Sequence, residues 1–159
     1  KRGNPMTSAT ATRLEQLGID LPQPSTSAAK YVPWVQTGNL VFTSGQLPLK
    51  DGALAATGLL GRDLDILDGQ EVARWCAVNV LAQLRDALDD LDRVQRLVKI
   101  TVFVASAPGF TDHHLVANGA SELLAAAFGD KGQHTRSAIG VVALPLNAPV
   151  EVEAVVEFA

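Results

Sequence analysis

One arginine and a run of glutamates stand at strand-like positions near the end of the chain, within residues 135–158. Read as strands, Arg136 shares one side of the first with Ala138 and Gly140, while Glu151 opens the polar side of the second. A guanidinium beside small residues can hold a carboxylate through paired hydrogen bonds. A glutamate can hold a water molecule as a general base. We therefore expect any chemistry of this chain in this segment.

Alternation alone also allows a plainer interpretation of these residues. An arginine on a strand is most often an ordinary surface or interface residue, and glutamates that alternate with valines usually mark a half-exposed strand. Glu153 and Glu157 are assigned to that plainer class. Glu151 is kept as a candidate base because it stands at the strand entrance, diagonal to Arg136 if the two strands pair.

The other reactive residue types give no second site. The histidines lack the spacing of a metal site and are predicted to be surface residues; they are His113, His114 and His134. Cys76 lies in an amphipathic segment, which predicts a buried thiol rather than a nucleophile. Ser44 lacks a GxSxG elbow and is predicted to be a hydrogen-bonding residue at a strand end. No metal site is expected.

Composition favours one globular domain that does not bind nucleic acid. The chain has 159 residues, 47% of them hydrophobic, and a net charge of −4, which disfavours a phosphate-binding surface. No apolar run approaches the roughly 20 residues of a membrane helix, so no membrane partner is expected. A single cysteine and no secretory signal predict a cytoplasmic protein.

Periodicity predicts an α+β fold of order β-β-α-β-α-β-β. Residues 1–5 are interpreted as an expression remnant before a native start at Met6, residues 6–28 as an N-terminal lead-in, and residues 29–159 as the single domain. Residues 8–17 are expected to form no more than a loose turn. The remaining predicted elements are a hairpin of strands 31–36 and 40–44, a helix 68–91 capped by Asp68, a strand 94–105, a helix 110–128 ended by Gly129, and the strand pair of 135–158.

Two helices would cover one face of such a sheet and leave the other without a partner. The uncovered face is expected to carry Glu151, Glu153, Val155 and Arg136, which is too mixed for a core. A subunit interface is the simplest way to use it.

Three segments resemble signatures of the Rid (RidA or YjgF, reactive intermediate deaminase) family. They are YVPWVQTGNLVFTSGQLP at 31–48, LVKITVFV at 97–104 and TRSAIGVVALPLNAPVEVEA at 135–154, and the resemblance spans residues 31–158. It implies a fold like that of the chorismate mutases, with a mixed six-stranded sheet, two helices on one face, and a homotrimer with ligand sites in clefts between subunits.

The same resemblance implies an activity. Many members hydrolyse reactive enamines and imines to 2-keto acids and ammonia without metal or cofactor, as hydrolases of the 2-iminobutanoate/2-iminopropanoate deaminase kind. The partners would be an imino acid or small carboxylate and further copies of the chain.

Site roles follow residue by residue from the resemblance. Arg136 would bind the substrate carboxylate and Glu151 would orient the attacking water. Tyr31 would line the cleft, and Ser44 with the Gly45 backbone would contact the ligand.

Three further positions match the family less closely. Asn118 would lie at the pocket, as would Phe110, although the spacing before both is altered. Ala138 stands where active deaminases commonly carry a cysteine, and segment 58–68 is longer than in the simplest members.

Two other functions remain open on this basis. The first is a non-catalytic trimer of the same fold that binds small carboxylates, which Ala138 favours. The second is RNA cleavage, an activity ascribed to some members, which the acidic charge disfavours.

Overall fold

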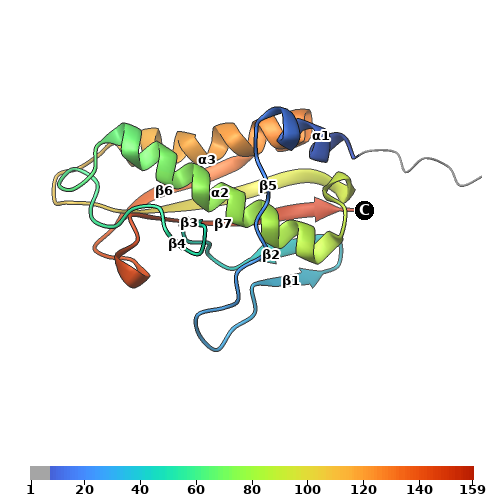
Figure 1. Ribbon diagram of the computed structural model, residues 1–159, viewed down its shortest axis with the longest axis horizontal. Coiled ribbons are helices and arrows are strands. Elements are labelled where there is room, and N and C mark those ends of the chain that lie inside the picture. Colours follow the sequence, from blue (N-terminus) through green and yellow to red (C-terminus); the bar gives the residue numbers. More distant parts are fainter. Residues whose placement is uncertain (1–7) are drawn as a thin grey trace, which may run out of the picture.

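A five-stranded mixed sheet forms the centre of the protein (Figure 1). The computed structural model describes residues 8–159, so the expected remnant at 1–5 and Met6 lie outside the described residues. The strand order is β1-β2-β7-β5-β6, in which β5 and β6 run parallel and the other neighbours antiparallel. The strands are β1 (Trp34–Thr37), β2 (Leu40–Thr43), β5 (Val94–Ala105), β6 (Thr135–Val141) and β7 (Val150–Phe158).

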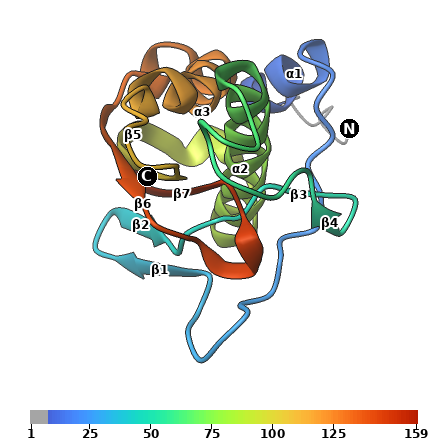
Figure 2. The ribbon, with the colours of Figure 1, turned by 90° about the vertical axis from the view of Figure 1, so that its left-hand side faces the viewer.

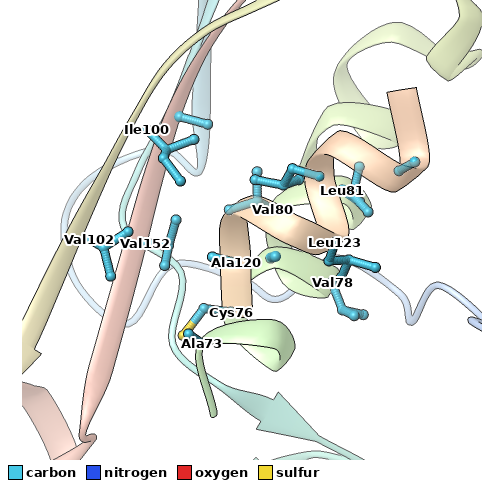
Figure 3. Close-up of a cluster of buried hydrophobic side chains, with 14 of the residues drawn as sticks. Ala73, Cys76, Val78, Val80, Leu81, Ile100, Val102, Ala120, Leu123 and Val152 are labelled. Carbon is cyan, nitrogen blue, oxygen red and sulfur yellow. The ribbon is translucent and has the colours of Figure 1, made fainter. Parts of the chain in front are cut away.

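Two long helices, α2 (Ile66–Leu88) and α3 (His113–Phe128), pack together on one face of this sheet (Figure 2). Alternation on the strands explains the arrangement, because every second residue of β7 from Val150 to Val156 is buried. Figure 3 shows Cys76 and Val80 of α2 near Ile100 of β5 and Val152 of β7, all inaccessible to solvent. The fold is therefore the predicted α+β layer with helices on one face.

The predicted helix boundaries are partly wrong. Helix α2 begins at Ile66, because the N-cap is Asp65, whose carboxylate accepts from the Asp68 amide while Asp68 accepts from the Asp65 amide. It ends at Leu88, followed by Asp89 with φ of 63°. Helix α3 ends before Gly129 as predicted but starts three residues later than expected.

Within residues 8–159 the main sheet contains five strands, not the six that the resemblance implies. After β2 the chain forms only one bridge to β7, between Gln46 and Val152. Asn79 of α2 then donates to the Leu49 carbonyl at 2.9 Å, which holds this stretch beside the helix. The result is a separate two-stranded hairpin, β3 (Leu49–Lys50) with β4 (Ala53–Leu54).

Residues 9–16 form a helix, α1 (Ala9–Gln16), and not the loose turn that was expected. The Asp92 carboxylate accepts from the amides of Ala9 and Thr10 at 2.8 and 2.9 Å. Leu14 is buried with the main core. The described part of the chain also contains three short 3-10 helices: η1 (Leu91–Arg93), η2 (Gly129–Gly132) and η3 (Pro145–Asn147). Over residues 8–159, no helix has the length and apolar character that crossing a membrane requires.

Candidate functional site

Arg136 and Glu151 lie on opposite faces of the sheet, which corrects the expectation that they are diagonal neighbours. Strand β5 lies between β6 and β7, so the two strands do not pair. Across the sheet, Arg136 aligns with Ile100, a core residue beneath the helices. Glu151 aligns with Phe103, which has the opposite facing because strand residues alternate. Arg136 therefore belongs to the helix-covered face and not, as predicted, to the open one.

Helix α3 holds the Arg136 guanidinium at the edge of the sheet. Nη1 donates to Asn118 Oδ1 at 2.9 Å and to Ser121 Oγ at 3.1 Å, and Nη2 donates to the His114 carbonyl at 2.7 Å. These residues fall on one stripe of α3 because they are three or four positions apart. Asn118, which was predicted to lie at the pocket, is thus in direct contact with Arg136.

The guanidinium keeps donors for a ligand. It has five N–H groups, and the three hydrogen bonds above are the ones it makes within residues 8–159, so the Nε–H and one Nη2–H remain. Nε–H and a neighbouring Nη2–H of a guanidinium can donate together to one carboxylate in bidentate fashion. Arg136 also lines a surface hollow of about 400 Å³ with Ser121, Glu122 and His134.

Ala138 follows Arg136 on the covered side of β6 and is half-buried against the core. Gly140, two residues further on, lies against His113, since a Cβ at that position would come within 2.5 Å of His113 Nε2. Phe110 packs edge-on against the His113 ring at 5.1 Å and makes no hydrogen bond to Arg136. We call Arg136, Asn118 and Ala138 the arginine half-site.

Glu151 is half-buried on the open face, against the backbone of Gly45. A Cβ at Gly45 would overlap the Glu151 carboxylate, so a larger residue there would displace the Glu151 side chain. Burial, together with the negative charge of Glu153, raises the pKa of Glu151 above its ordinary value. A carboxylate with a raised pKa is a stronger base, which suits a water-orienting role.

Ser44 precedes Gly45 at the end of β2, and Tyr31 lies on the segment that Ser44 contacts. Ser44 Oγ donates to the Val32 carbonyl at 2.7 Å, which ties the segment that carries Tyr31 to the end of β2. Tyr31 itself is 52% exposed. Ser44 therefore has the predicted hydrogen-bonding role. We call Ser44, Gly45 and Glu151 the glutamate half-site, and the placement of Tyr31 in the cleft stays a prediction.

Two of the three histidines are not the plain surface residues that were predicted. His134 Nε2 lies 2.8 Å from Ser121 Oγ, and His113 Nε2 lies 2.9 Å from Ser106 Oγ; both rings are half-buried. The contact between Ser121 and His134 could not be predicted from their positions in the sequence. The two residues come together because η2 reverses the direction of the chain between α3 and β6. Over residues 8–159 no group of His, Cys, Asp or Glu is suited to hold a metal ion.

Comparison with known proteins shows which family the chain is similar to. Residues 11–158 match the model of the "YjgF/chorismate mutase-like, putative endoribonuclease" family. Protein TCP17 of Trypanosoma cruzi is 49% identical over 92% of this chain and 92% of its own.

Two solved structures are similar in fold as well. Protein Atu1372 of Agrobacterium tumefaciens has a TM-score of 0.89 at 48% identity, over 94% of this chain and 92% of its own. TdcF of E. coli, solved with bound serine, has a TM-score of 0.64 at 25% identity, over 89% of this chain and 97% of its own. The chain belongs to the YjgF/chorismate mutase-like family, which is the Rid family that its motifs resemble.

Proposed function

We propose that this chain hydrolyses reactive imino acids, or their enamine tautomers, to 2-keto acids and ammonia. The observation that carries the proposal is the state of Arg136, whose guanidinium is fixed by α3 through three hydrogen bonds and keeps Nε–H and one Nη2–H as donors for a carboxylate. Charge-assisted hydrogen bonds of this kind contribute about 1.5–3 kcal/mol. TdcF, a relative that binds serine, supports a small amino-acid-like carboxylate as the ligand class.

Water is the nucleophile in this proposal. Glu151 accepts a proton from a water molecule whose oxygen attacks the iminium carbon, and the resulting carbinolamine then takes up that proton on nitrogen. Glu151, ionised again, accepts the hydroxyl proton of the carbinolamine as the C–N bond breaks, so that the carbonyl of the 2-keto acid forms and ammonia leaves. That proton then passes from Glu151 to ammonia or to solvent. Ala138 has no thiol or hydroxyl, so the covered side of β6 offers no competing nucleophile at this position.

The two half-sites face different sides of one chain, so we propose that a second copy completes the cleft. A homotrimer would bring the arginine half-site of one subunit to the glutamate half-site of the next. The open face supports association, because Val35, Phe42 and Ile139 are 50%, 44% and 44% exposed there.

Activity of single variants tests the assigned roles. Imines generated freshly from amino acids are mixed with each protein, and ammonia release is followed against the uncatalysed rate. Arg136→Ala should weaken small-carboxylate binding about 10- to 100-fold, and Glu151→Ala should remove the rate enhancement while binding persists. Glu157→Ala is the matched control, since Glu157 lies on the same face of β7 and bonds to Asn39 instead. Unchanged turnover in both site variants would contradict the roles assigned to Arg136 and Glu151.

Mixed oligomers test whether the cleft is shared. Arg136→Ala and Glu151→Ala chains are inactive alone but, when refolded together, should form about a quarter of their clefts from two intact half-sites. Activity should therefore return in the mixture. If both residues act within one subunit, mixing restores nothing.

A non-catalytic carboxylate-binding trimer is the second candidate, and Ala138 in place of the expected cysteine is the observation that favours it. In that case the protein would bind pyruvate through Arg136 without accelerating imine hydrolysis.

RNA cleavage, which the family description names, is disfavoured by the net charge of −4. We propose a cytoplasmic location, because a chain with a single cysteine has no internal disulfide framework, which fits a reducing compartment.

A further inference from the structure

The Arg136 guanidinium is one end of a directed chain of hydrogen bonds. His134 Nδ1 lies 2.7 Å from the Gly132 carbonyl, His134 Nε2 lies 2.8 Å from Ser121 Oγ, and Ser121 Oγ lies 3.1 Å from Arg136 Nη1. The groups come from η2, the entry to β6, and α3. Except for Gly132, which is buried, they are half-buried, and all of them line the hollow of about 400 Å³ at the sheet edge.

The Gly132 carbonyl at the end of this hydrogen-bond chain determines which atom carries the hydrogen at each step. A carbonyl only accepts, so the Gly132 oxygen requires the hydrogen on His134 Nδ1. In the neutral ring Nε2 is then an acceptor, and the Ser121 hydroxyl donates to it. The Ser121 oxygen is left to accept from Arg136, so each group is used once and in one direction.

A second proton on the His134 ring would reverse the direction of the hydrogen bond between His134 Nε2 and Ser121 Oγ. Both ring nitrogens then donate, the Ser121 oxygen accepts from His134 and Arg136 together, and the hydroxyl hydrogen turns into the hollow. Protonation would thus add a positive charge and a free O–H donor beside Arg136. Both changes favour an anion in the hollow.

We propose that Ser121 and His134 are positioning residues for carboxylate binding at Arg136, and that they make this binding tighter as the pH falls from 8 to 5. The inference rests on the proposed function, because it takes Arg136 as the carboxylate site. Its ligand class is the 2-keto acid product, for which pyruvate serves as the probe.

Other charged residues lie near His134, and their effect on the pH response can be tested separately. On α3 the exposed Glu122 lines the same hollow, and on β6 the neighbouring charge is Arg136 itself. On η2, Asp130 and Lys131 line a different hollow, with Arg13 and Asp92. Glu122→Gln therefore isolates the one carboxylate that shares the hollow with His134.

The experiment measures the Kd of pyruvate at several pH values between 5 and 8, the interval in which histidine charge changes fall. Wild type should bind several-fold tighter at pH 5, and Glu122→Gln should keep that slope. Ser121→Ala should bind about three- to tenfold more weakly at pH 8, and Ser121→Thr should recover the loss because it keeps the hydroxyl. His134→Gln should abolish the slope.

The second serine–histidine pair supplies a matched control. His113 bonds to Ser106 and not to the Arg136 chain, so His113→Gln should keep the wild-type pH dependence. A measurement on the wild-type protein needs no variant: long-range ¹H–¹⁵N spectra at pH 8 should show the neutral His134 ring as the Nδ1–H tautomer.

Three results would overturn the inference, and one of them concerns the proposed function as well. An Nε2–H tautomer contradicts the proton assignment. A pH slope that survives in His134→Gln, with binding lost in Arg136→Ala, removes the role of His134 while the carboxylate site stands. No pyruvate binding by wild type at any pH would remove the carboxylate site and the positioning role together.

Discussion

Glu151 and Glu153 are two residues apart on one face of β7, yet their surroundings differ. Glu151 lies against Gly45, where burial and the charge of Glu153 raise its pKa. Glu153 lines a separate hollow of about 300 Å³ with Lys99 and Thr101. The second glutamate, assigned from the sequence to the half-exposed strand face, therefore has an electrostatic effect on the first.

The pH dependence of the proposed activity should report that effect. Glu151 must be ionised to accept a proton, so kcat/KM should fall as the pH drops through a pKa above the ordinary 4.5. Glu153→Gln removes the neighbouring charge but not the burial, and should move this acid limb part of the way to lower pH. The pH–rate profile of each protein measures the shift.

Glu157→Gln serves as the control, because that residue lies further along β7 and bonds to Asn39. Its acid limb should coincide with that of wild type. A limb that stays in place in Glu153→Gln, or moves to higher pH, contradicts the coupling of the two carboxylates.

At the scale of elements, α1 depends on a residue far along the chain. Its first amides donate to Asp92, 83 residues beyond Ala9. Partial burial acts to raise the pKa of Asp92, but the hydrogen bonds from Thr10 and Ala9 outweigh it and lower the pKa to about 2. An isolated helix of 8 residues is marginal in water, so this attachment explains why α1 forms.

Asp92→Asn should destabilise the protein at neutral pH by about 1 kcal/mol, the usual effect of losing a helix cap. The folded-state pKa is depressed, so the stabilisation is present above the ordinary 3.8 and is lost as the pH falls towards 2. Urea unfolding at pH 7 and pH 2.5 should show a difference that shrinks at the lower pH.

Asp20→Asn provides the comparison, since Asp20 is an exposed carboxylate in the same N-terminal segment. It should leave the free energy of unfolding unchanged at both values. An Asp92→Asn effect that is equally large at pH 2.5 would mean that charge is not what attaches α1.

Local periodicity predicts elements here better than it predicts their ends and partners. The predicted strand 94–105 coincides with β5, because alternating apolar residues and the break at Pro108 both bound it. The start of α2 was misplaced because Asp65 and Asp68 are both plausible caps, and each caps the other. Helix α1 was missed because its stabilising partner, Asp92, leaves no trace in the local sequence.

Residue alternation does not show how β6 and β7 are placed relative to each other; the strand order of the sheet does. Strand β5, helix α3 and strand β6 form one crossover unit, which makes β5 and β6 parallel neighbours. Strand β7 then pairs with the other side of β5. The types and spacing of Arg136 and Glu151 mark them as site candidates, but only this strand order shows that they face opposite ways.

For the whole molecule, one face of the sheet is covered by helices and the other is exposed to solvent. Helices α2 and α3 cover the first, while Phe42 on the second is 44% exposed beside Val155 of β7. A lysine at such a position places a charge where apolar contact is needed. We predict that Phe42→Lys lowers the mass in solution from that of a trimer to that of a monomer, as measured by light scattering after size exclusion.

Leu67→Lys is the matched control, because Leu67 is 75% exposed on α2, away from the open face. It should leave the mass unchanged. A wild-type monomer, or a Phe42→Lys trimer, would refute the assignment of the open face to self-association.

The burial of Cys76 provides a label that needs no engineering. Its thiol is inaccessible and donates to the Val150 carbonyl at 3.4 Å, one residue before Glu151. Burial and the charge of Glu151 raise the pKa of Cys76 well above its ordinary value, so a thiol reagent meets neither an exposed sulfur nor a thiolate. Reaction requires α2 and β7 to separate, and the rate of covalent modification of the native chain therefore reports how often the core opens beneath the glutamate half-site.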